Sequence, residues 1–286
     1  MIPSSVDYKR ASSVEEAIQL LKDDPSAKIL SGGHSLIPAM KLRMSAPSTL
    51  IDIARISELN FIRDRGKYIA IGANTTHGTI ASHKTITQKL PLLAQAAELI
   101  GDVQVRNKGT IGGSIAHADP ASDWPAVLIA AEATIKVQGA YGERKIPASE
   151  FFKGFFYTEL QEGEIITEIH VPEPNSANVR SSYQKFMQPA SRFAIVGCAA
   201  QLVFEGNTIT SAKVAFNGVS DHAYSATAVE AALIGQEFTT ELCETAAVLA
   251  LEGAEMVMSD HYANEDYRGH IAKVYCKRAL LGCMYD

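Results

Sequence analysis

The sequence predicts an α+β protein of two compact units, and three observations support this prediction. The chain has 286 residues, whereas a single domain commonly holds roughly 100–200. Its first part alternates short apolar strands with helices, which is typical of α/β units. A linker over residues 172–178, rich in proline and asparagine, then precedes a hairpin and several alanine-rich helices. We therefore expect an N-terminal domain over 1–174, with subdomains over about 1–57 and 58–174, and a C-terminal α+β domain over 178–286.

The first subdomain is expected to be a small α/β unit. Residues 13–24 have the pattern of an amphipathic helix, with Ser13 as N-cap and Glu16 three positions later. Apolar strands are expected over 27–30 and 49–53. In the second subdomain we expect strands over 68–72, 134–138 and 165–171, a helix over 90–100 closed by Gly101, and a helix from Ser122 through Ala133.

The C-terminal domain is expected to begin with a hairpin. Strands over 194–205 and 208–218 are joined by the turn Glu205-Gly206-Asn207. Three helices are expected to follow, over about 224–234, 239–256 and 266–284.

Composition excludes several classes of function. Lys and Arg number 26 against 32 Asp and Glu, which gives a net charge of −6. This balance argues against nucleic acid or an acidic membrane surface as the main partner, because both attract basic proteins. No run approaches the ~20 apolar residues of a membrane span, and the N-terminus lacks the apolar core of a secretion signal, so we expect a cytoplasmic protein.

The cysteines predict neither a zinc site nor an iron–sulfur cluster. Both kinds of site need thiolates at short spacing, and this chain contains no CxxC pair. We expect reduced thiols at the four positions, which are Cys198, Cys243, Cys276 and Cys283.

A glycine pair follows the strand 27–30, in the segment Ile29-Leu30-Ser31-Gly32-Gly33-His34-Ser35-Leu36. Consecutive amide N–H groups with no Cβ in front of them can bind phosphate oxygens. The segment is neither a Rossmann fingerprint nor a P-loop, since it lacks G-x-G-x-x-G and Gly-Lys-Ser/Thr. Taken alone, such a pair is more often only a tight turn.

A second glycine pair lies in Thr110-Ile111-Gly112-Gly113-Ser114, shortly before Asp123. We expect Gly112 and Gly113 to free further backbone donors, and Asp123 to accept from ribose or ribityl hydroxyls. The alternative is that Ser122 and Asp123 merely cap the following helix. Two such loops in separate α/β units suggest a long diphosphate cofactor between them.

Three segments together resemble a known family. They are Ser-Gly-Gly-His-Ser-Leu-Ile-Pro (31–38), Ile-Gly-Ala-Asn-Thr-Thr-His (71–77) and Thr-Ile-Gly-Gly-Ser-Ile-Ala-His-Ala-Asp-Pro-Ala-Ser-Asp (110–123). The resemblance is to the FAD-binding medium subunit of molybdenum hydroxylases, which include carbon monoxide dehydrogenase and xanthine-oxidising relatives. It spans essentially the whole chain and implies a two-subdomain FAD-binding fold of the vanillyl-alcohol-oxidase (PCMH) type, with the dinucleotide between the subdomains.

The resemblance also implies which residues bind FAD. Asp123 falls where the family has a carboxylate on cofactor hydroxyls, and Phe193 where many members have a Tyr. Flavin contact and simple packing both stay open for His77 and His117. The positions carried over are Ile29, Leu30, Ser31, Gly32, Gly33, His34, Ser35 and Leu36 in the first loop, Thr110, Ile111, Gly112, Gly113 and Ser114 in the second, Asp123, and the flavin-lining positions Ile100, Ile166 and Lys185.

The implied function is electron transfer through non-covalent FAD, within a dimer of heterotrimers. A large subunit would carry the molybdopterin, and a small subunit two 2Fe–2S clusters. The chain itself shows no nucleophile–base pattern, in keeping with a protein whose cofactor supplies the chemistry. One alternative is a free-standing flavin oxidase or reductase of the same fold, since Gly32-Gly33-His34 resembles the covalent flavin site of berberine-bridge-type oxidases. Another is an interaction module that has lost the flavin.

Overall fold

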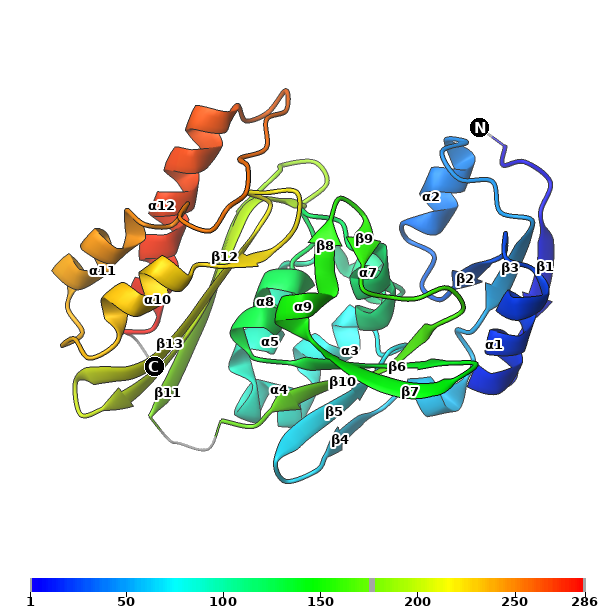
Figure 1. Ribbon diagram of the computed structural model, residues 1–286, viewed down its shortest axis with the longest axis horizontal. Helices are drawn as coiled ribbons and strands as arrows, with labels where there is room; N and C mark the ends of the chain where they lie inside the picture. Colours follow the sequence, from blue (N-terminus) through cyan, green and yellow to red (C-terminus); the bar gives the residue numbers. More distant parts are fainter. Residues whose placement is uncertain (1, 175–177, 285–286) are drawn as a thin grey trace.

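The computed structural model describes residues 2–174 and 178–284, and it begins with a small parallel sheet (Figure 1). The strands lie in the order β1-β3-β2. Ser13 caps the first helix by accepting from the Glu16 amide, as expected. Ala17, Ile51 and Ile53 form the core of this first subdomain with their neighbours. The elements are β1 (Asp7–Arg10), α1 (Val14–Asp23), β2 (Lys28–Leu30), α2 (Leu36–Lys41) and β3 (Thr49–Asp52).

A five-stranded antiparallel sheet, in the order β4-β5-β10-β6-β7, forms the base of the second subdomain. Helices cover it, and a two-stranded hairpin, β8–β9, lies above them in Figure 1. The strands are β4 (Ile62–Asp64), β5 (Tyr68–Gly72), β6 (Thr134–Gly139), β7 (Gly142–Pro147), β8 (Phe152–Gly154), β9 (Tyr157–Thr158) and β10 (Ile165–Pro172). The helices are η1 (Ser57–Leu59), α3 (His77–Ser82), α4 (Lys84–Lys89), α5 (Pro91–Leu99), α6 (Val103–Arg106), α7 (Ile111–His117), α8 (Trp124–Ala130) and α9 (Ala148–Phe151).

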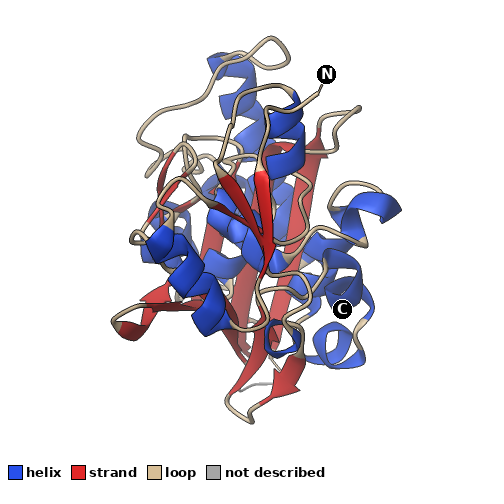
Figure 2. Ribbon diagram, turned by 90° about the vertical axis from the view of Figure 1, so that its right-hand side faces the viewer, coloured by secondary structure: helices blue, strands red, loops and turns tan. Residues whose placement is uncertain are grey.

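The C-terminal part is a four-stranded antiparallel sheet, β11-β12-β13-β14, between two layers of helices. Helices α10, α11 and α12 cover one face, while α5 and α8 of the second subdomain pack against the other. Figure 2 shows the first subdomain in front of these layers. The elements are β11 (Val179–Met187), β12 (Ala194–Glu205), β13 (Thr208–Asn217), β14 (Tyr224–Ser225), α10 (Thr227–Leu233), α11 (Thr240–Ala247) and α12 (Glu265–Gly282).

Three predicted helices differ from the structure at their ends. The helix expected from residue 224 begins at Thr227, because Tyr224 and Ser225 pair with β13. The helix expected to continue to 256 ends at Ala247, where the backbone tightens into turns such as Val248 N–H to Thr245 O. The helix expected to continue to Ala133 ends at Ala130. Among the described residues, no helix is long and apolar enough to cross a membrane.

Candidate functional site

The first glycine loop connects β2 to α2 and leaves its amides free. Gly33 has a φ of +72°, a conformation that glycine adopts without the Cβ penalty. Within the described residues, no oxygen accepts from the amide N–H groups of Gly32, Gly33, His34 or Ser35. The predicted set Ile29–Leu36 therefore spans the end of a strand, four free donors and the first residue of α2. Such a run of donors is suited to phosphate oxygens.

The second glycine pair differs from the prediction, because its amides already donate hydrogen bonds to other atoms of the protein. It forms the first turn of α7, and Thr110 caps that helix. Ile111 N–H donates to Thr75 O at 3.1 Å, and Gly112 N–H to Ala73 O at 2.9 Å. Gly113 N–H donates to Thr110 Oγ1 at 3.2 Å. Of this pair only Gly113 is exposed, so the segment offers one surface position without a Cβ atom, rather than the expected second set of backbone donors.

Close packing explains why two of these positions are glycine. A Cβ on Gly112 would lie 2.5 Å from Ala73 Cβ, and a Cβ on Gly32 would overlap the Lys108 carbonyl oxygen. The first loop therefore lies directly on the backbone that leads into α7. Hydroxyl contacts join the same elements, with Ser31 Oγ 2.6 Å from Asn74 Oδ1 and 3.0 Å from Thr110 Oγ1.

A cleft of about 560 Å³ lies between the two loops. We call residues 30–34, 37 and 38 its first wall, and Asn74, Thr76, Asn107, Lys108 and Thr110 its second wall. Among the described residues no carboxylate lines the cleft, although the chain has 32 acidic residues. The lining residues are Leu30, Ser31, Gly32, Gly33, His34, Ile37, Pro38, Ala54, Asn60, Asn74, Thr76, Asn107, Lys108 and Thr110.

Several of these lining residues were missed by the sequence reasoning. Asn74 and Thr76 belong to the segment 71–77 that supports the family resemblance, and that segment was the signal available for them. Lys108 lies two residues before Thr110, within reach of the same motif. By contrast, Gly112, Gly113 and Ser114 are not among the residues that line this cleft.

His77 is buried and hydrogen-bonds the backbone next to the second wall. Its Nδ1 accepts from Trp124 Nε1 at 3.0 Å, and its amide donates to Gly109 O at 3.0 Å. Burial lowers the pKa of His77 to about 4, so the ring is neutral at neutral pH. His117 packs its ring against Phe156, 5.0 Å between centroids. Both histidines are therefore held by protein contacts in the structure.

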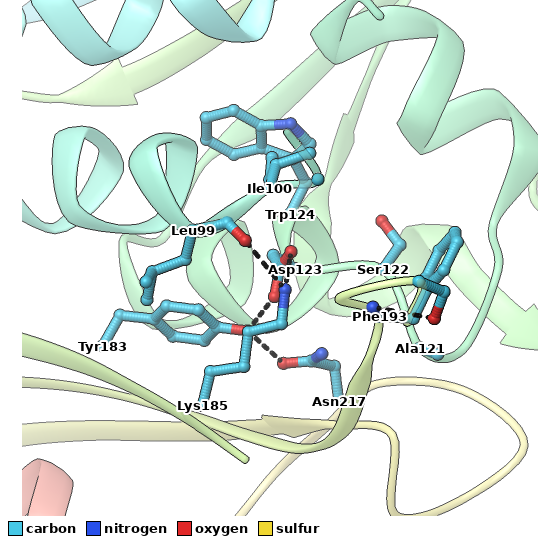
Figure 3. A network of polar contacts seen from close by, with 12 residues as sticks. Leu99, Ile100, Ala121, Ser122, Asp123, Trp124, Tyr183, Lys185, Phe193 and Asn217 are labelled. Atoms are coloured by element: carbon cyan, nitrogen blue, oxygen red, sulfur yellow. Dashed lines mark hydrogen bonds and ion pairs between the residues drawn. The ribbon is translucent and has the colours of Figure 1, made fainter. Parts of the chain in front are cut away.

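A buried polar network joins the N-terminal part to the C-terminal sheet (Figure 3). Asp123 Oδ2 accepts from Lys185 Nζ at 2.8 Å, and Asp123 Oδ1 accepts from the Tyr183 hydroxyl at 2.5 Å. Lys185 Nζ also donates to Leu99 O at 3.2 Å, next to Ile100. Asp123 occupies the N-cap position of α8, but its side chain makes no cap hydrogen bond and points to the neighbouring sheet. The Ser122 hydroxyl contacts Ser114 Oγ at 2.8 Å, so the alternative that the two side chains merely cap the helix is wrong.

The electrostatics of this network follow from its burial. Desolvation raises the pKa of Asp123 and lowers that of Lys185, and the attraction between the two groups opposes both shifts. Burial also raises the pKa of Tyr183 well above its usual range. Two buried donors have no partner among the described residues, Asn217 Nδ2 and Arg192 Nε. Asn217 belongs to the network, since its Oδ1 lies 3.2 Å from the Tyr183 hydroxyl.

The predicted residues lie in more than one place. Leu30 to His34 and Thr110 line the cleft, whereas Ile100, Asp123 and Lys185 lie at the junction with the C-terminal sheet. Ile166 is buried on β10 beside Val137 and does not line the cleft. Phe193 is 43% exposed, on the loop whose Ala194 N–H donates to Ala121 O. No group of three or more potential ligands among residues 2–174 and 178–284 could hold a metal ion.

A glycine loop with free amides, facing a cleft that no carboxylate of the described residues lines, suits a protein that binds a phosphorylated small molecule. Comparison with known families identifies the particular class of protein. Residues 4–174 match the FAD binding domain in molybdopterin dehydrogenase, and residues 181–283 match the CO dehydrogenase flavoprotein C-terminal domain. The chain belongs to this family of FAD-binding medium subunits of molybdenum hydroxylases, and it is a component of an oxidoreductase complex.

Individual relatives extend over nearly the entire chain. The carbon monoxide dehydrogenase medium chain of Hydrogenophaga pseudoflava is 41% identical over 98% of this chain and 97% of its own length. The glyceraldehyde dehydrogenase medium chain of Sulfolobus acidocaldarius is 38% identical over 98% and 99%. A solved carbon monoxide dehydrogenase from Hydrogenophaga pseudoflava, which lacks the Mo-pyranopterin moiety, superimposes with a TM-score of 0.96 at 42% identity, covering 99% of both chains.

Proposed function

We propose that this chain is the electron-transfer subunit of a heterotrimeric molybdenum hydroxylase, with FAD bound non-covalently across the cleft. In this proposal a small subunit with 2Fe–2S clusters delivers electrons, and an external acceptor removes them. A large subunit with molybdopterin oxidises the substrate, and two heterotrimers form the assembly, in the cytoplasm. The observation that carries the proposal is the cleft itself, with the free amides of Gly32, Gly33 and His34 on one wall and no carboxylate of the described residues on its lining.

The residues present suit FAD. Free amides at Gly32, Gly33 and His34 match the oxygens of a diphosphate, whose negative charge would be repelled by a cleft lined with acids. The surface at Gly113 is exposed, and a Cβ there would meet only Thr110 Oγ1, so a flat or extended ligand can approach closely. A volume of about 560 Å³ is that of a small-molecule site.

The residues at the junction with the C-terminal sheet suit the redox end of the cofactor. When bound, the flavin takes up electrons and passes them on. Ile100 supplies an apolar surface beside the Asp123–Lys185 pair. Arg192 Nε and Asn217 Nδ2 are buried donors without a partner among the described residues, and such donors favour a ligand rich in acceptors. We therefore assign the diphosphate to the glycine loop and the ring to the junction with β11.

The partners are inferred from the relatives. Several are named as medium chains or as subunits of dehydrogenase complexes, and this chain covers nearly their full length. A free-standing oxidase or reductase remains the second candidate, and only Gly32-Gly33-His34 favours it. In the structure, His34 Nδ1 instead lies 3.0 Å from the Gly32 carbonyl oxygen.

Purification from the native host tests the proposal. A tagged chain is recovered gently, and its eluate is examined for partner chains, flavin absorbance, iron and molybdenum. Two partners with FAD and both metals would support the subunit assignment. A lone yellow protein that retains its flavin after acid precipitation would contradict it and favour the oxidase, and a colourless lone protein would contradict flavin binding itself.

A further inference from the structure

The two walls of the cleft differ in what they can donate. The first wall has free amides, whereas three amides of the second wall, those of Asn74, Asn107 and Lys108, already donate to the carbonyl oxygens of Leu59, Val103 and Val105. Asn74 is also satisfied, because its Nδ2 donates to Ile53 O at 2.7 Å and its Oδ1 accepts from Ser31. The second wall therefore offers an anion its side chains and the amides of Thr76 and Thr110, which have no acceptor among the described residues.

Lys108 is the residue on that wall with the suitable chemistry. Its side chain is exposed and lines the cleft, and no carboxylate among the described residues pairs with it. Its backbone is fixed at both ends. The Lys108 amide donates to Val105 O at 3.1 Å, and its carbonyl oxygen lies against Gly32. The backbone of Lys108 is thereby held against the glycine loop of the opposite wall, which leaves its exposed side chain within reach of a ligand on that loop.

An unpaired cation next to free amides favours a ligand with phosphate groups. Charge-assisted hydrogen bonds to phosphate are about twice as strong as neutral ones, and two adjacent phosphates present oxygens to both walls at once. We propose that Lys108 is the second-wall counter-charge for the diphosphate of the cofactor. It makes the cleft selective for ligands with a diphosphate, so that FAD and ADP bind well, whereas FMN and adenosine bind weakly.

This inference rests on the proposed function, and binding measurements on the full chain test it. We compare wild type with Lys108→Met, which keeps the length of the side chain, and with Lys108→Arg, which keeps the charge. Lys145→Met is the matched control, since Lys145 is an exposed lysine on β7 that does not line the cleft. Dissociation constants are measured by titration calorimetry for FAD, ADP and adenosine, after the flavin has been removed.

Lys108→Met is expected to weaken both FAD and ADP by about tenfold, with adenosine unchanged. Lys108→Arg and Lys145→Met should bind all three ligands as wild type does. Added salt should weaken ADP binding to wild type more than to Lys108→Met, because one charge contact is then missing. Unchanged FAD and ADP binding in Lys108→Met, or equal losses for ADP and adenosine, would overturn the assignment.

The same measurements distinguish a failure of the proposed function from a failure of the role given to Lys108. A wild-type chain that binds neither FAD nor ADP would refute FAD binding and the role of Lys108 together. A wild-type chain that binds FAD tightly, with Lys108→Met indistinguishable from it, would refute only the role of Lys108.

Discussion

Lys185, on the first strand of the C-terminal sheet, donates to Asp123 at the start of α8, with 2.8 Å between Nζ and Oδ2. The two residues are 62 positions apart in sequence, and their side chains are only 1% and 5% exposed. Ion pairs removed from water in this way are costly to break, because one charge then stays buried without a partner. The pair therefore links the cofactor-binding part of the chain to the sheet behind it.

Breaking this pair should destabilise the protein strongly. We expect Lys185→Met or Asp123→Asn to lower the free energy of unfolding by about 3–5 kcal/mol, measured by urea denaturation. The double variant should lose less than the sum of the two, since neither charge is then stranded.

A second interdomain pair provides the control. Lys213 Nζ lies 2.8 Å from Glu132 Oε1, the same separation, but the two side chains are 37% and 57% exposed. Lys213→Met should therefore cost less than about 1 kcal/mol. Equal losses for Lys185→Met and Lys213→Met would contradict the role given to burial.

The two glycines of the second motif should have different roles, Gly113 in binding the cofactor and Gly112 in packing. Gly113→Val adds a side chain on the exposed surface of α7, where its Cβ lies 2.8 Å from the capping Thr110 Oγ1, so we expect loss of FAD with only a small fall in the melting temperature. Gly112→Ala places a Cβ 2.8 Å from the Ala73 carbonyl oxygen, so we expect it to lower the melting temperature itself. Flavin absorbance per chain and thermal unfolding distinguish the two. Full FAD occupancy in Gly113→Val would refute its place at the cofactor.

Local pattern was sufficient to find the first glycine loop. A strand ending in Gly32-Gly33 must turn, and the positive φ of Gly33 agrees with that reading. The state of the second loop could not be read locally, because its amides bond to carbonyls of Ala73 and Thr75, some 36–39 residues earlier in the chain. These amides find acceptors only because the five-stranded sheet places the residues after β5 next to them.

Long-range partners explain the other errors as well. Asp123 precedes a helix, so capping was a reasonable alternative, and only the position of β11 gives it Lys185 and Tyr183 instead. Lys108 carries no signal of its own in the sequence. Its importance appears when its carbonyl oxygen is found against Gly32, on the opposite wall of the cleft.

His77 should make stability depend on pH. Its pKa of about 4 in the folded chain lies below the usual 6.5, so the unfolded chain binds the proton first as the pH falls. The stabilisation is complete above pH 6.5 and is lost progressively as the pH falls toward 4, by about 3 kcal/mol in total. Fluorescence of Trp124, the single tryptophan, reports unfolding at each pH.

The matched variant is His77→Gln, which can still accept from Trp124 Nε1 but does not titrate. We expect the stability difference between wild type and this variant to shrink steadily between those two pH values. Parallel stability curves for the two proteins would show that His77 does not contribute.

Arg268 should hold the loops that meet the N-terminal part. It is 2% exposed, and its Nη1 donates to Ile195 O and Gly218 O, both at 2.6 Å. Its neighbours Ala194 and Gly218 in turn donate to Ala121 O and Pro120 O, next to Asp123. Arg268→Met strands two buried carbonyls, at about 1–3 kcal/mol each.

The reaction rate of the buried thiols shows whether the loss of the Arg268 hydrogen bonds also loosens the core of the C-terminal domain. Burial raises the pKa of Cys198 and Cys243, so in the folded chain these thiols should react slowly with a disulfide reagent. Arg268→Met should react several-fold faster, and Arg268→Lys should only partly restore protection, because an ammonium cannot form the same forked contacts. Arg278→Met, an exposed arginine on the same helix, should react like wild type. Equal rates for Arg268→Met and Arg278→Met would mean that α12 packing alone, without the Arg268 hydrogen bonds, fixes these loops.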